Sequence, residues 1–230
     1  MRVRISRRFA TTLIASICIG LCGAVPVEAQ TPGPAHDRPA VISIELWSID
    51  DRILHGDRSP EDRFLAEAQY TISGMIYGWS FRYVPESRVR AVGQEFALQP
   101  HASIPWGDPA LNVREVRSVD NILYGLTDYR LSQHDRARRE SWQSIATVRS
   151  SGVGTGDILA GADGKLLAIE EAIRDAIDRH LRMVVPNRPR EAHGDVVLAE
   201  APRIRPISGL YEARVHVLIR IEAVLPYLVY

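Results

Sequence analysis

Residues 166–184 read LLAIEEAIRDAIDRHLRMV, and this stretch decides the fold. Its apolar side chains recur every three or four residues, which is the spacing of one face of an α-helix. They are Leu166, Ile169, Ile173, Ile177, Leu181 and Val184. His180 falls on or near this face, so we expect it to be a packed core residue. The pattern predicts a long helix that buries one face and stops at Pro186.

The opposite face of this helix carries acid–arginine pairs four residues apart, with the acid first. The pairs are Glu170–Arg174, Asp175–Arg179 and Asp178–Arg182. This order is the favourable one on a helix, and each exposed pair contributes roughly 0.2–0.5 kcal/mol. These pairs are expected to stabilise the helix on the face opposite its apolar one.

Residues 213–223 predict the sheet against which the helix packs. Apolar side chains occupy every second position, as in a strand that is buried on one side and wetter on the other. They are Ala213, Val215, Val217, Ile219, Ile221 and Ala223. Residues 41–49 alternate in the same way through Ile42, Ile44 and Leu46. We expect further strands around residues 95–98, within 111–132 and over 141–149.

A second long helix is predicted from Pro60 to Val84, ending before Pro85. Ser59 can cap it, Pro60 suits the first helical position, and two acids follow. The order strand, helix, strand thus appears twice, and the two helices match weakly at an offset of 101 residues. The sequence predicts an α+β fold, with a mainly antiparallel or mixed sheet and two long helices packed on it. Residues 41–230 form one domain, which a duplication would divide into halves 41–132 and 141–230.

The predicted helix over residues 60–84 is apolar on two opposite sides, and one of these sides is rich in tyrosine and glycine. That side consists of Tyr70, Gly74, Tyr77, Gly78 and Phe81. A helix that is apolar on two sides must be covered on both. Either the fold itself covers the second side, or a partner protein, a second copy or a lipid surface does so. These five residues are the candidate partner-binding site.

Residues 152–156 read GVGTG and precede a helix, as a phosphate-binding loop would. The glycine spacing does not fit the dinucleotide pattern, and Gly164-Lys165 lacks the rest of the P-loop motif. We expect a flexible hairpin or linker here and predict no cofactor. Lys165 is the only lysine among 28 basic residues. The arginine bias reflects either base composition or a selection for contacts with anions.

Three histidine–aspartate pairs are close in the sequence: His55–Asp57, His101–Asp108 and His134–Asp135. Such pairs can perform acid–base chemistry or bind a metal. None of them has further partners at a recognisable spacing, and residues 134–139 read as a charged turn. We therefore predict no catalytic residue and no metal site. An envelope hydrolase that uses His55 and Asp57 is the alternative interpretation.

Residues 1–29 have the features of an export signal, with four arginines followed by an apolar run that ends near Ala29. We expect cleavage there and a flexible leader over residues 30–40. The segment from Ser6 to Phe9 leaves twin-arginine export open as an alternative to general secretion. Both cysteines, Cys18 and Cys22, lie in the removed segment, so the mature chain has no disulfide.

Removing four arginines and Glu28 from 28 basic and 28 acidic residues leaves 24 and 27. This balance argues against nucleic-acid binding, which needs a basic surface. No transmembrane span is expected in the mature chain, although peripheral association with the envelope is compatible with the sequence. The apolar end, residues 226–230, is expected to pack on the domain. We predict an exported periplasmic or envelope protein that binds a protein partner or its own copy.

Overall fold

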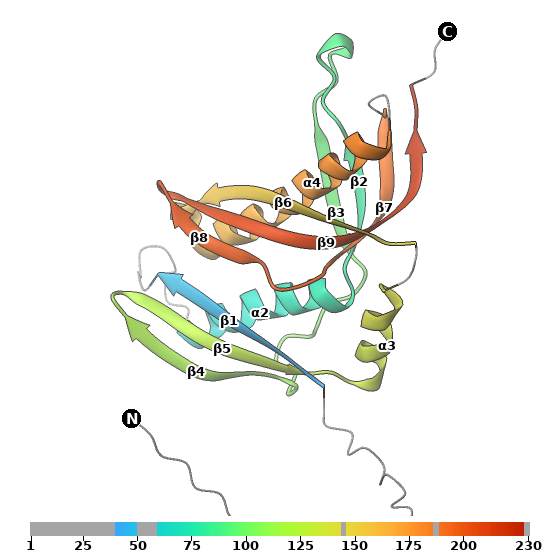
Figure 1. The fold of residues 1–230 in the computed structure, drawn as a ribbon. Helices are drawn as coiled ribbons and strands as arrows, with labels where there is room; N and C mark the ends of the chain where they lie inside the picture. Colours follow the sequence, from blue (N-terminus) through green and yellow to red (C-terminus); the bar gives the residue numbers. More distant parts are fainter. Residues whose placement is uncertain (1–39, 50–58, 144–145, 186–188, 228–230) are drawn as a thin grey trace, which may run out of the picture. The chain divides into compact units, whose positions relative to one another are not determined.

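The computed structural model describes residues 40–49, 59–143, 146–185 and 189–227. Within these residues the fold is α+β, and all of the strand pairs are antiparallel. The strands form two sheets (Figure 1). Buried apolar residues of both sheets belong to one hydrophobic core. None of the described helices is both long enough and apolar enough to cross a membrane.

The first sheet has three strands, in the order β1 (Val41–Ile49), β5 (Ile122–Arg130) and β4 (Leu111–Val119). Its inner face buries Ile42, Ile44 and Leu46, as the alternation in residues 41–49 predicts. Asp120 and Asn121 both have positive φ and form the turn between β4 and β5. This left-handed backbone is one that asparagine and aspartate tolerate well.

The second sheet follows the order β3 (Glu95–Pro100), β2 (Trp79–Val84), β7 (Glu191–Leu198), β9 (Leu210–Leu225) and β6 (Val148–Asp157). Strand β8 (Arg203–Ile207) also pairs with β9. The helix α4 (Gly161–Val184) covers β6 and β9. Of its predicted apolar face, Ile169, Ile173, Ile177 and Leu181 are buried, whereas Leu166 is half-buried and Val184, in the last turn, is exposed. The predictions for residues 166–184 and 213–223 are therefore confirmed.

The helix α2 (Pro60–Ile76) lies between the two sheets and contacts β1, β4 and β5 in one and β7 in the other (Figure 1). Ser59 caps it by accepting a hydrogen bond from the Asp62 amide. The predicted end at Val84 is wrong, because the helix stops at Ile76. Gly78 has a φ of +68° and donates its N–H to the Ser73 carbonyl. This is a glycine terminus of a helix, and residues 79–84 continue as strand β2.

Two further predictions are wrong between residues 133 and 157. Residues 134–139 are not a turn but lie within helix α3 (Gln133–Ser141), in which Ser132 and Asp135 form a reciprocal capping box. The predicted strand over 141–149 begins only at Val148. The glycine-rich segment is neither a hairpin nor a linker, because Gly152, Gly154 and Gly156 all lie within β6.

The two strand–helix–strand segments differ in how their strands pair. Strands β1 and β2 lie in different sheets, whereas β6 and β7 flank β9 in the same sheet. The match at an offset of 101 residues also breaks down at Val84, which lies in a strand while Val185 caps a helix. A duplication of the chain stays a prediction.

Candidate functional site

A cavity of about 340 Å³ opens beside α2, between this helix, the start of β2, the end of β3 and α4. Three of the five predicted partner-binding residues, Tyr70, Gly74 and Gly78, line it. The apolar lining includes Trp79, Leu98 and Leu166, and Glu170 is its one charged lining residue within the described chain. The volume lies in the range of small-ligand pockets in proteins.

The indole of Trp79 forms one wall of the cavity and leaves no room for a side chain at position 74. A Cβ atom placed on Gly74 would lie 2.1 Å from Cη2 of Trp79. The ring therefore packs directly on the backbone of α2, which requires glycine at this position. The Tyr70 ring lies against the same indole, with centroids 5.5 Å apart and an angle of 42° between the planes. The two rings give the cavity an aromatic side.

Glu170 faces this cavity instead of forming the ion pair that the sequence predicts. Arg174 pairs with Glu171, at 2.5 Å, and donates to Gln94. The predicted Glu170–Arg174 pair is therefore wrong, whereas the pairs Asp175–Arg179 and Asp178–Arg182 are confirmed at 2.8 and 2.5 Å. Among the residues that the structure describes, no cation pairs with Glu170.

The Tyr70 hydroxyl donates a hydrogen bond to Oε1 of Glu170, with a donor–acceptor distance of 3.4 Å. Burial raises the pKa of Glu170, and the bond from Tyr70 only partly offsets this. Burial also raises the pKa of Tyr70, with Glu170 adding to the effect. The cavity thus holds a half-buried carboxylate beside an aromatic wall, and this carboxylate accepts a long, weak hydrogen bond from Tyr70.

The other two predicted residues lie away from the cavity. Tyr77 is the C-cap of α2, and its hydroxyl donates to Oδ1 of Asp135 at 2.6 Å. Phe81 is 3% exposed and belongs to the core, on β2 rather than on a helix. The single helical face predicted from Tyr70 to Phe81 is therefore wrong. The helix ends between Gly74 and Gly78, and the fold itself buries the far end of the segment.

The loop that follows β3 is tied to α2 by two polar contacts along the wall of the cavity. The Gln69 side-chain amide donates to the Ile104 carbonyl at 2.5 Å, and Ser73 Oγ accepts from the Ile104 amide at 2.9 Å. Ile104 is fully buried. These contacts hold the loop against the helix at Ile104, so this wall of the cavity is fixed by hydrogen bonds.

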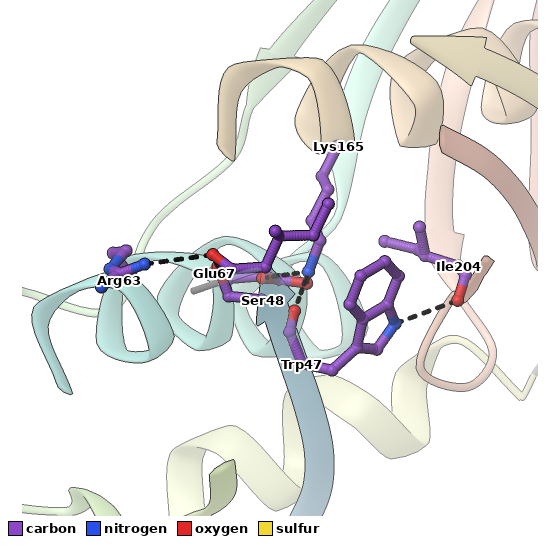
Figure 2. Close-up of polar contacts among 7 residues, drawn as sticks. Trp47, Ser48, Arg63, Glu67, Lys165 and Ile204 are labelled. Atoms are coloured by element: carbon purple, nitrogen blue, oxygen red, sulfur yellow. Dashed lines mark hydrogen bonds and ion pairs between the residues drawn. The ribbon is translucent and has the colours of Figure 1, made fainter. Parts of the chain in front are cut away.

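A buried ion pair, which the sequence does not predict, lies deeper between the sheets. Lys165 Nζ is 3.0 Å from Oε2 of Glu67, and it also donates to the Trp47 carbonyl. It lies 4.3 Å from the centroid of the Trp47 ring, whose Nε1 donates to the Ile204 carbonyl at 3.1 Å. Figure 2 shows the lysine reaching from α4 toward Glu67 on α2 and Trp47 on β1. With side chains only 3% and 10% exposed, the pair is structural rather than a binding site.

The histidine–aspartate pairs also differ from those that the sequence brings together. His101 Nε2 lies 2.9 Å from Oδ1 of Asp195, a residue 94 positions away, rather than beside Asp108 of its own loop. Asp195 accepts a second bond, from Arg220 on β9. His180 is buried on α4, as predicted, and burial lowers its pKa. His55 and Asp57 lie outside the described residues.

Asp135 is held by hydrogen bonds from three other residues. Its oxygens accept from Tyr77, from Tyr129 and from the amide and hydroxyl of Ser132. Burial alone would raise the pKa of Asp135, but these bonds outweigh it and lower the pKa. Tyr77 shows the opposite shift, because burial and its hydrogen bond to Asp135 raise the pKa of Tyr77 to about 12. Of the two residues His134 and Asp135, which are adjacent in the sequence, Asp135 therefore has a structural role.

Replacing Asp135 with asparagine will lower the free energy of unfolding at pH 7 by about 1.5–3 kcal/mol, since bonds to a buried carboxylate are lost. A carboxyl whose pKa is lowered by folding stabilises the fold above its ordinary value of 3.8. That stability is lost as the pH falls through the folded-state pKa, so the difference between variant and wild type shrinks below about pH 3.8. Urea unfolding at pH 7 and pH 3 measures both effects.

The matched control for this prediction is Asp62→Asn, which removes an exposed acid from the first turn of α2. Its expected loss is below about 1 kcal/mol. Equal losses for the two variants would contradict the role assigned to Asp135.

A protein-family model matches residues 31–227, so the chain belongs to the family that this model describes. The chain is 26% identical to an uncharacterized protein of Treponema pallidum (strain Nichols), over 98% of this chain and 97% of the relative. No solved structure matches the chain.

Proposed function

We propose that this member of the family is a binding protein of the cell envelope, which takes part of a protein partner into the cavity beside α2. The observation that carries the proposal is the combination of an aromatic wall, an apolar floor and one carboxylate that pairs with no cation of the described part of the chain. Pockets that bind ligands typically combine apolar walls with a few convergent polar groups. Aromatic and apolar side chains are also enriched at protein contacts.

The envelope location rests on the sequence. Residues 1–29 have the form of an export signal, and the chain that follows contains no cysteine. They lie outside the described residues, so the location is part of the proposal. A domain of about 200 residues can be stabilised by its core alone, without disulfides.

Binding is favoured over catalysis by how the reactive groups are used. Lys165 and Glu67 are buried against each other. Asp195, which approaches His101, is also bound by Arg220, so its charge is already compensated. The side chains of Gln69 and Ser73 hold the cavity wall in place. The alternative, an envelope hydrolase that uses His55 and Asp57, predicts an activity that is lost on His55→Ala.

A photo-crosslinking amino acid at position 102 will give a discrete protein adduct in intact cells, and the adduct will lie in the envelope fraction. Ala102 is exposed and lines the cavity. The matched control is position 97, which is exposed on β3 one residue from the cavity-lining Leu98. Because side chains alternate along a strand, Ala97 faces away from the cavity and should give no such adduct.

Equal labelling from both positions would contradict the proposal, as would the absence of any adduct from position 102. Recovery of the full-length, uncleaved chain from the cytosol would contradict the envelope location. Light scattering on the mature chain identifies the case in which the adduct is a second copy of this chain.

A further inference from the structure

Among the described residues, Glu170 is the one charged residue that lines the cavity, and no cation of these residues pairs with it. Burying an ionised carboxylate is unfavourable unless it is paired or well hydrogen-bonded. The side chain that could have paired with it from the next turn, Arg174, contacts Glu171 and Gln94 instead. The Tyr70 hydroxyl, at 3.4 Å, is a long and weak donor. The site therefore offers a negative charge for a ligand of opposite charge.

The surroundings of this carboxylate specify more than charge. The Tyr70 and Trp79 rings stand on one side, and an aromatic face attracts a cation that lies within about 6 Å of its centroid. Leu98, Leu166 and Pro100 supply an apolar lining. Lysine and arginine place an apolar stem along such a surface while the charged head reaches a polar group. A free inorganic cation would leave most of this lining unused.

We propose that the cavity receives a lysine or arginine side chain of a partner protein, with its head at Glu170 and its stem along Tyr70 and Trp79. This inference rests on the proposed function and names the part of the partner that enters. The volume of about 340 Å³ accommodates one long side chain together with part of a neighbouring residue. Charge complementarity with Glu170 selects the class of side chain.

The chain itself restricts which partner can supply a lysine. Its only lysine is Lys165, which is 3% exposed and paired with Glu67. A second copy of this chain therefore has no accessible lysine to insert, and it could offer only arginine. A preference for lysine over arginine would identify a different protein as the partner.

The test uses blocked pentapeptides with a central lysine, arginine or norleucine between leucines, titrated into the mature chain and followed by NMR at low salt. Norleucine keeps the apolar stem and removes the charge. We expect the lysine and arginine peptides to bind wild type at least tenfold more tightly than the norleucine peptide. In Glu170→Gln, which keeps the side-chain shape, this ratio should fall below about twofold. Ala102→Trp, which fills the mouth of the cavity, should abolish binding of all three peptides. Thermal unfolding of each variant confirms that it is folded.

The outcomes separate the two proposals. If wild type binds all three peptides equally and Ala102→Trp abolishes this, the cavity binds peptide but the choice of a cation is overturned. If wild type binds none of them, the inference is overturned, and the crosslinking result at position 102 then decides the proposed function by itself. If n-butylamine binds as tightly as the lysine peptide, the ligand is a small amine and the partner side chain is overturned.

Discussion

Replacing Lys165 with methionine will lower the free energy of unfolding by about 3–5 kcal/mol, because the change leaves the Glu67 carboxylate buried without its cation. The two side chains are 3% and 10% exposed, and Nζ lies 3.0 Å from Oε2. The Trp47 carbonyl would lose its donor in the same step. Since a typical domain is stable by about 5–15 kcal/mol, a loss of this size removes a large fraction of the total. Urea unfolding monitored by circular dichroism measures the loss.

Two controls identify the buried pair as the cause. Arg179→Met breaks an exposed pair with Asp175, in which the arginine side chain is 54% exposed, and should cost less than about 1 kcal/mol. Adding Glu67→Gln to Lys165→Met removes the unpaired charge and should recover part of the stability. A loss below about 1 kcal/mol in Lys165→Met, or no recovery in the double variant, would contradict the buried ion pair.

The position of this pair explains why the expected effect is large. Lys165 extends from α4, which covers the second sheet, whereas Glu67 belongs to α2 and the Trp47 carbonyl to β1 of the first sheet (Figure 2). The contact therefore joins the two sheets through their helices. We expect the two sheets to unfold in one cooperative transition in wild type.

The elements predicted correctly from the sequence are those with a regular hydrophobic period. Residues 166–184 and 213–223 repeat with the periods of a helix and a strand, and the structure has both elements there. The sequence predicts too long a helix at residues 60–84, because the apolar residues of β2 follow directly after those of α2. Gly78 was the available signal, since a glycine with a following change of period marks a helix end.

Three of the five predicted site residues lie at the cavity, but they lie there for another reason than the one that the sequence suggests. Tyr70, Gly74 and Gly78 do line the cavity, but through packing against Trp79 rather than as one helical face. Glu170 was missed because spacing four residues from Arg174 favours an ion pair, and only the tertiary fold shows that Arg174 contacts Gln94. The Glu67–Lys165 pair spans 98 residues and has no local pattern. The sole lysine was the one unusual residue that could have indicated it.

Residues 152–156, which the sequence predicts to be a flexible hairpin or linker, lie in β6 and pack against α4. Gly154 lies on the face of β6 that α4 covers, and a Cβ atom there would lie 2.2 Å from the Ala172 amide nitrogen and 2.4 Å from the Ala168 carbonyl oxygen. Both are backbone atoms, which cannot move aside as the end of a side chain can. Gly152 and Gly156 meet the same helix equally closely, at 2.0 Å from the Ala172 oxygen and 1.9 Å from the Gly164 oxygen. The glycines thus set the distance between helix and strand.

Replacing Gly154 with valine will therefore lower the free energy of unfolding by more than about 3 kcal/mol, the upper end of ordinary overpacking, since the backbone of α4 must move away from β6. Gly93→Val is the matched control, because a Cβ atom at Gly93 meets nothing within 4 Å. Its expected change is within about 0.5 kcal/mol. If both variants unfold at the same urea concentration, α4 does not pack on β6 through these glycines. A lower urea midpoint for Gly154→Val alone would show that the glycines serve the packing of α4 on β6. The GVGTG sequence is then explained by helix packing, without a phosphate ligand.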